Sequence, residues 1–185
     1  FTWSVDPAVG TITAEGVFTA GEKSASGTLK VSAGGTSVSI PVTVAGHIKT
    51  LEDCEGDLSA FSSTSSVTLS AETGLDYVRY GRQSLKAAYD ASSGTASFPV
   101  ALTMASGEAY LSVWVYGDGS GNTLLATAAD SSGGVHQMTL GALSFTGWKQ
   151  LSAALPKGAV SLQELSVVYA GGQKTGKLWL DQFTT

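Results

Sequence analysis

Residues 110–116 read Tyr-Leu-Ser-Val-Trp-Val-Tyr, and aliphatic residues alternate there with polar or aromatic ones. Successive side chains of a β-strand point to opposite faces of its sheet, so this period of two predicts a strand. One face then carries Leu111, Val113 and Val115, which predicts the side that packs in a core. The other face remains available for a ligand, and it carries Tyr110, Ser112, Trp114 and Tyr116.

Short stretches with similar strand signals recur on both sides of this segment, separated by turns rich in Gly, Ser and Asp. This spacing is typical of an all-β sandwich or jelly roll. Helix signals are nearly absent, and no βαβ alternation appears, which argues against a nucleotide-binding α/β fold. The expected strands are residues 48–52, 67–71, 84–89, 95–100, 109–116, 123–129, 135–140, 148–153, 163–169 and 177–183.

Residues 1–46 form a separate all-β segment. The pair Gly34-Gly35 separates two alternating stretches, residues 28–32 and 36–44, which predicts a hairpin. A hairpin and its neighbours bury little apolar surface alone, so we expect a preceding segment or the second domain to complete this half-sandwich. Because Phe1 does not open a signal peptide, we expect the chain to be an internal or processed piece. We place the domain boundary between residues 46 and 47, giving domains 1–46 and 47–185.

The first domain resembles the bacterial Ig-like repeats of surface adhesins and cell-wall enzymes. Residues 3–12 read Trp-Ser-Val-Asp-Pro-Ala-Val-Gly-Thr-Ile, and residues 16–21 read Gly-Val-Phe-Thr-Ala-Gly. These stretches and the hairpin correspond to the later strands of such a repeat, while its first strands are absent. The resemblance implies a partial Ig-like sandwich that acts as a spacer or adhesion module.

Several local motifs occur in order along the second domain. They are Leu51-Glu52-Asp53 with Gly56-Asp57-Leu58, residues 80–90, residues 110–122, Gly147-Trp148-Lys149, and residues 176–183 (Gly-Lys-Leu-Trp-Leu-Asp-Gln-Phe). Together they span nearly all of residues 48–185 and resemble the jelly rolls grouped as galactose-binding-like or carbohydrate-binding modules. Similar jelly rolls are appended to secreted phosphodiester glycosidases of Gram-positive bacteria, so the resemblance implies a secreted or cell-surface bacterial protein.

A structural calcium ion that joins the opening strand to the closing strand is a further implication of this resemblance. Calcium takes several oxygen ligands, from carboxylates and carbonyls together. Asp181 lies between apolar residues on the closing strand, and Glu52 or Asp53 would supply opposing oxygens, with carbonyls of residues 81–83. The alternative is that Asp181 and Glu52 are exposed edge residues or caps.

Sugar binding requires aromatic faces against pyranose rings and polar groups for the hydroxyls. Trp114 and Tyr116 lie on the expected outward face, and Trp179 alternates against two leucines. We expect Tyr169 to join them, with Arg79, His136 and Gln137 at the border. The alternative is that these aromatics pack under loops, and Trp148 after Gly147 is interpreted as such a core or corner residue.

Other function classes are disfavoured by the composition. Only 14% of the residues are charged, the net charge is −5, and the basic residues do not cluster, which argues against nucleic acid. No apolar run reaches the roughly 18 residues that span a bilayer. Cys54, the single cysteine, lacks a partner pattern for nucleophilic chemistry, and with two distant histidines it makes no zinc site. No nucleophile elbow appears, and the acidic residues mostly lie in turns.

The sequence therefore predicts a non-catalytic accessory module that binds a polysaccharide or glycan. Its partner would be a catalytic domain of the same parent chain, held near its substrate by the tether. The alternative belongs to another class: both domains are purely structural spacer or docking modules of a cell-surface protein, without a sugar site.

Overall fold

The computed structural model describes residues 1–21, 25–44 and 48–185 of the chain. Contacts between Cα atoms divide the chain into two compact units, Phe1–Lys49 and Thr50–Thr185, which are described separately below. The boundary predicted between residues 46 and 47 lies outside the described residues. Within the part of the chain that is described, no helix has the length and apolar character needed to cross a membrane.

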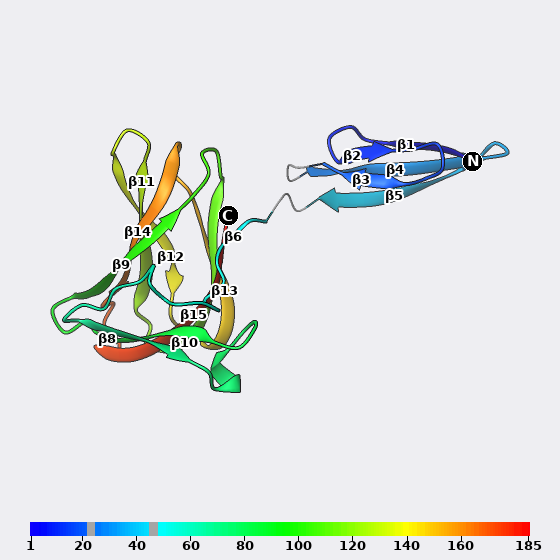
Figure 1. Ribbon diagram of the computed structural model, residues 1–185. Helices are drawn as coiled ribbons and strands as arrows, with labels where there is room; N and C mark the ends of the chain where they lie inside the picture. The colour runs from blue at the N-terminus through cyan, green and yellow to red at the C-terminus, as the bar shows by residue number, and fades with distance from the viewer. Residues whose placement is uncertain (22–24, 45–47) are drawn as a thin grey trace. The chain divides into compact units, whose positions relative to one another are not determined.

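The first unit is built around the predicted hairpin (Figure 1). Strands β4 and β5 pair antiparallel with Ala33 opposite Thr36, and the turn between them holds Gly34 and Gly35 at φ values of +53° and +83°. Both values lie in the left-handed region that glycine adopts without strain. The prediction is confirmed. The strands of this unit are β1 (Thr2–Val5), β2 (Gly10–Ile12), β3 (Phe18–Ala20), β4 (Ala25–Ala33) and β5 (Thr36–Val44), with sheet order β1-β4-β5 and a separate β2-β3 pair.

The apolar face of this hairpin is only partly covered. Leu29 lies opposite Ile40 and Val31 opposite Val38, so the four share one face as expected. Ile40 is nevertheless 45% exposed and Val38 56% exposed. The described part of this unit therefore encloses a small core of its own.

The second unit is a sandwich of two antiparallel sheets (Figure 1). All ten predicted strands are present, and their ends differ from the predicted ones by a few residues. The all-β fold class is confirmed. One sheet has the order β13-β10-β15-β8-β7 and contains β13 (Thr146–Ala154), β10 (Tyr110–Asp118), β15 (Thr175–Thr184), β8 (Ser84–Asp90) and β7 (Val67–Glu72), with β6 (Thr50–Glu52) paired to β15. The other contains, in order, β12 (Val135–Ala142), β11 (Thr123–Asp130), β14 (Ala159–Val168) and β9 (Thr95–Thr103).

The core lies between these two sheets and uses the aliphatic face of β10. Leu111, Val113 and Val115 are completely buried there, as predicted from their alternation. Leu124 of β11 and Leu180 of β15 are also fully buried in this cluster. Because one face of β10 is fixed in the core, its aromatic face points out of the sandwich.

Leu180 provides a test of this core. We expect Leu180→Ala to lower the free energy of unfolding by about 2–5 kcal/mol, because the cavity left by a fully buried leucine collapses only partly. Leu75→Ala is the matched control, since Leu75 is 92% exposed and its truncation should cost less than about 0.5 kcal/mol. Urea titration of both variants measures the difference, and equal losses would contradict the assigned core.

Candidate functional site

A row of aromatic side chains crosses the outward face of the six-stranded sheet. Tyr116 of β10 lies opposite Trp148 of β13 on one side and Trp179 of β15 on the other. Residues opposite each other in an antiparallel pair share a face, so the three form one row. Tyr116 meets Trp148 edge-on at 5.7 Å and Trp179 at 5.4 Å between ring centroids. We call Trp148, Tyr116 and Trp179, with the neighbouring Trp114 and the loop residues Tyr77, Arg79 and Tyr80 that cover them, the aromatic face.

The loop between β7 and β8, residues 73–83, covers one end of this row. It contains the short 3-10 helix η1 (Leu75–Tyr77), and the Tyr77 ring stacks on Trp179 at 4.0 Å with 13° between the planes. Trp179 is only 8% exposed, and its Nε1–H donates to Glu72 Oε2 at 3.3 Å. Trp179 therefore supports Tyr77 from below and presents little surface of its own.

A second aromatic group lies beside this row. The Arg79 guanidinium sits 4.3 Å from the ring centroid of Trp114 and 4.9 Å from that of Tyr80. Tyr80 in turn meets Trp114 edge-on at 6.1 Å and remains 44% exposed. A cation over aromatic faces is attracted by their quadrupoles, so this contact holds the loop against the sheet.

Asp181 anchors the same loop from below. Its side chain is completely buried opposite Trp114, and Oδ2 accepts hydrogen bonds from the backbone N–H groups of Arg79 (2.9 Å) and Tyr80 (3.0 Å). Burial raises the pKa of Asp181 above its usual range, although these N–H groups act in the opposite direction. The closing-strand carboxylate thus positions the residues that cover the aromatic face.

The expected calcium ligands lie near one another in the fold, but Glu52 and Asp53 accept hydrogen bonds from backbone N–H groups. Strand β6 pairs with β15, with Glu52 opposite Phe183. Glu52 Oε1 accepts from the Cys54 N–H, and the exposed Asp53 accepts from its own turn at Glu55. In the described ranges, no three His, Cys, Asp or Glu side chains form a group that could hold a metal ion. Asp181 Oδ1, however, is buried with no hydrogen-bond partner among these residues, and a hard cation would satisfy it.

The reading of Asp181 as an exposed edge residue is wrong, because it is completely buried. Glu52, which is half-buried, does cap a turn through the Cys54 N–H at 2.7 Å. The fit to calcium is therefore partial. Asp181 and Glu52 lie on adjacent strands, and Asp181 has a free buried oxygen, but backbone carbonyls would be needed to complete a calcium site.

Cys54 is not poised for nucleophilic chemistry. Burial raises the pKa of its thiol well above the usual range, and the charges of Asp181 and Glu52 act in the same direction. The thiolate is the reactive species, so a thiol held protonated at neutral pH is inert. Cys54 therefore contributes to the core beneath the loop that follows β6.

Three of the expected residues lie away from the aromatic face. Tyr169 follows β14 in the other sheet, and Lys174 Nζ lies 5.8 Å from its ring centroid. His136 Nε2 pairs with Asp130 Oδ2 at 2.8 Å beside the β11–β12 turn, and Gln137 lies on β12. The structure brings together Trp114, Tyr116, Trp179 and Arg79, but not these three.

Three aromatic residues of the face were not predicted as part of it. Trp148, interpreted above as a core residue, lies half-buried on the outward face, and its Nε1 is buried with no partner among the described residues. Its alternation with the buried Leu151 and Ala153 is the signal that could have placed it there. Tyr77 and Tyr80 belong to a loop without periodicity, so no sequence signal pointed to them.

Comparison with solved structures agrees with a β-sandwich. A family model described as flagellar filament outer layer protein FlaA matches residues 106–183, which is less than half of the chain. No curated protein matches the sequence. A solved structure from work on the promiscuous specificity of carbohydrate-binding modules of the β-sandwich superfamily is similar at 14% identity, with a TM-score of 0.54, over 98% of this chain and 82% of that one.

Two further solved structures are similar over about three quarters of this chain. TmCBM61 in complex with β-1,4-galactotriose has 15% identity and a TM-score of 0.50, over 73% of this chain and 96% of that one. The CBM22-1 and GH10 modules of Clostridium thermocellum xylanase 10B, complexed with xylohexaose, have 18% identity and a TM-score of 0.50, over 74% of this chain and 28% of that one. At these identities the likeness shows the fold alone.

The buried carboxylate of Asp181 makes a testable prediction about pH. Because the pKa of Asp181 is raised in the folded protein, its contribution to the free energy of unfolding is present at low pH. This contribution is lost as the pH rises through the pKa of the folded state. In the presence of chelator, we expect the amide oxygen of Asp181→Asn to accept from both N–H groups, as the carboxylate does. The variant should therefore match or exceed the stability of the wild type at pH 7. Asp181→Ala should lose about 1–3 kcal/mol, because two N–H groups lose their acceptor.

Urea titrations at several pH values between 4 and 7 measure these differences. The advantage of Asp181→Asn over the wild type should grow with pH over this range. An Asn variant as unstable as the Ala variant at pH 7 would show instead that the loop needs the negative charge.

Proposed function

We propose that residues 50–185 form a non-catalytic carbohydrate-binding accessory domain. The observation that carries this proposal is the aromatic face: Trp148, Tyr116 and the loop residue Tyr77 lie together on the outward face of a β-sandwich. The similar solved structures described as carbohydrate-binding modules support it through their shared fold. Fold alone does not decide function, so the face itself carries the argument.

Stacking against sugar rings is the expected contribution of the half-buried rings Trp148, Tyr116 and Tyr77. Gln150, exposed and opposite Trp114, adds an amide at the border.

An uncharged sugar suits this face. Lys86 Nζ lies 3.2 Å from Glu72 Oε2, so the two charges are paired. The Gly74 N–H, the Trp179 indole and Lys86 hold the pKa of Glu72 below its usual range, so it is ionised at neutral pH. A paired carboxylate and ammonium offer hydrogen bonds to hydroxyls without attracting a net charge.

The biological setting follows from the sequence resemblance. We propose that the domain belongs to a secreted or cell-surface bacterial protein, with a phosphodiester glycosidase-like catalytic domain elsewhere in the parent chain. The first unit would act as an Ig-like spacer. Tethering the catalytic domain to glycan raises the local substrate concentration without any new catalytic group.

A structural role without sugar binding is the second candidate. It is favoured by the loop that covers the face, since Tyr77 stacks over Trp179 and Arg79 over Trp114. The family model that matches residues 106–183 describes a flagellar filament outer layer protein, which also supports a structural assembly. In this reading, both units are spacer or docking modules of a cell-surface protein.

Titration with soluble glycans, followed by tryptophan fluorescence, distinguishes the two candidates. We expect at least one neutral oligosaccharide to bind, and Trp148→Ala to weaken it at least tenfold, a change of about 1.4 kcal/mol. Trp114→Ala tests the neighbouring group in the same way. Tyr169→Ala is the control, because Tyr169 lies in the other sheet and should leave affinity unchanged.

The outcome that supports the structural candidate is the absence of binding across xylan, glucan, galactan and cell-wall polysaccharides. Binding that Trp148→Ala and Tyr169→Ala weaken equally would remove the aromatic face from the proposal.

We also propose a structural calcium ion beside β15, held by Asp181 and Glu52 and completed by backbone carbonyls. Asp181 Oδ1 is the free buried oxygen that supports this site. Calcium binding to the folded state alone raises stability by mass action.

Thermal melts with and without chelator test the ion. We expect the melting temperature of the wild type to rise with millimolar calcium and to fall with EDTA. Asp181→Asn should show neither response, while Asp53→Asn, an exposed carboxylate of the same turn, should respond like the wild type. A wild-type melt that does not change between calcium and EDTA would exclude the ion.

A further inference from the structure

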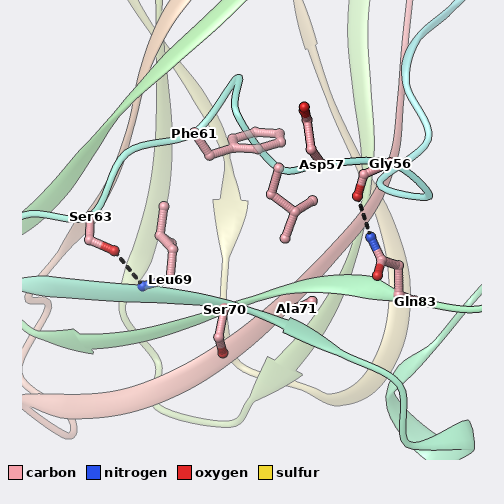
Figure 2. A pocket seen from close by; sticks show the side chains of 9 residues that line it. Gly56, Asp57, Phe61, Ser63, Leu69, Ser70, Ala71 and Gln83 are labelled. Atoms are coloured by element: carbon pink, nitrogen blue, oxygen red, sulfur yellow. Dashed lines mark hydrogen bonds between the residues drawn. The ribbon is translucent and has the colours of Figure 1, made fainter.

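A hollow of about 370 Å³ lies between the loop that follows β6 and strand β7 (Figure 2). It lies mainly on the other side of the sheet from the aromatic face. Leu69 and Ala71 point to one side of β7, whereas Ser70, which lies opposite Lys86 and so on the side of Trp179, points to the other. Its volume is near the lower end of the range for small-molecule sites. The lining residues are Gly56, Asp57, Leu58, Phe61, Ser63, Leu69, Ser70, Ala71 and Gln83.

One wall of the hollow is the outer edge of the sheet. Strand β7 is outermost and pairs only with β8. The N–H groups of Val67 and Leu69 point away from β8, since they donate to Thr64 Oγ1 (3.1 Å) and Ser63 Oγ (2.9 Å). In an antiparallel pair the same orientation recurs at every second residue, so the N–H and C=O of Ala71 also point outward. No group of the described residues bonds to them there.

The opposite wall is apolar. Leu58 and the largely buried Phe61 come from the loop, and both pack on the core that also contains Leu69. Figure 2 shows Phe61 on the loop above strand β7 and Leu69 rising from the strand below it. A sugar ring has apolar C–H groups and polar hydroxyls. The C–H groups would pack on the apolar wall, and the hydroxyls would bond to the free backbone edge.

The polar side chains around the hollow are held by hydrogen bonds and still have a free donor or acceptor atom. Gln83 Nε2 donates to the carbonyls of Cys54 (2.6 Å) and Gly56 (2.7 Å), which leaves its Oε1 as an acceptor. Ser63 Oγ accepts from Leu69 and keeps its own proton to donate. Asp57 Oδ1 accepts from Ser59, which holds the pKa of Asp57 below its usual range and leaves Oδ2 free.

We infer that this hollow is a second carbohydrate site, which takes the end of a neutral saccharide chain, one or two sugar residues long. The inference rests on the proposed sugar-binding function and extends it to a site outside the aromatic face. The hollow offers both donors and acceptors to the hydroxyls of a sugar, and no lining residue is basic. An anionic sugar would meet Asp57 without a compensating charge.

A peptide strand fits this edge less well than a sugar. Strand addition needs a run of free backbone groups along an edge. Ser63 and Thr64 already accept from the N–H groups of Leu69 and Val67, so only the short stretch beyond the Leu69 N–H is open. Such a stretch is shorter than the usual strand of about five residues.

NMR of the whole ¹⁵N-labelled chain tests the site residue by residue, with xylobiose, cellobiose and β-1,4-galactobiose as probes. We expect at least one disaccharide to shift the amide signals of Leu69, Ala71 and Gln83 in a saturable way. Ala71→Trp should weaken this binding at least tenfold, because the new side chain fills the hollow. Thr68→Trp is the matched control on the other face of the same strand, and it should bind like the wild type.

The aromatic face serves as the internal reference of the same experiment. Shifts confined to the indole signals of Trp114 and Trp148 would overturn the second site and leave the proposed function intact. No shift at either place with any probe would overturn both. Amide shifts at the hollow that persist unchanged in a folded Ala71→Trp protein would also overturn the site, and the wild-type titration decides the matter if that variant does not fold.

Discussion

The buried carboxylate of Asp181 is the interaction on which the outward face depends. A carboxylate without exposure loses its hydration, and this cost is offset only where hydrogen bonds replace the water. Two backbone N–H groups of the β7–β8 loop, those of Arg79 and Tyr80, provide that replacement. The loop is thereby held over the sheet at the point where Arg79 reaches Trp114.

The remaining contacts of this loop fix it at both ends. Ser84 Oγ donates to the Tyr77 carbonyl at 2.6 Å, which sets the Tyr77 ring over Trp179. At the other end, the Glu55 carboxylate accepts from the N–H groups of Arg82 and Gln83. Gly81 has a φ of +72°, which glycine adopts without strain, and a Cβ there would displace that carboxylate from its hydrogen bonds. One loop therefore borders the aromatic face with Tyr77 and the hollow with Gln83, and the two surfaces share a support.

The sequence was sufficient for the sandwich because its signal is local. Alternation over residues 110–116 needs only that one face of a strand is buried, and Leu111, Val113 and Val115 are indeed in the core. The same rule correctly put Trp114 and Tyr116 on the outward side. It could not tell that Trp179 lies beneath Tyr77, because loop residues have no period and their course depends on contacts distant in sequence. Tyr169 was misplaced for a related reason: strand order between the two sheets cannot be read from periodicity.

Division of the face between sheet and loop has a consequence for recognition. The strand residues Trp148 and Tyr116 are held by the pairing of β10 with β13. Tyr77 and Tyr80 belong to a loop that is held by hydrogen bonds to Asp181. Rigid elements give a site its precision, and loops tolerate change in sequence and length. A change in residues 73–83 can therefore alter the surface that lies over Tyr116 while the core remains intact. A change at Asp181 that removes this acceptor oxygen acts differently, since it releases the N–H groups of Arg79 and Tyr80 together and alters the shape of the whole face.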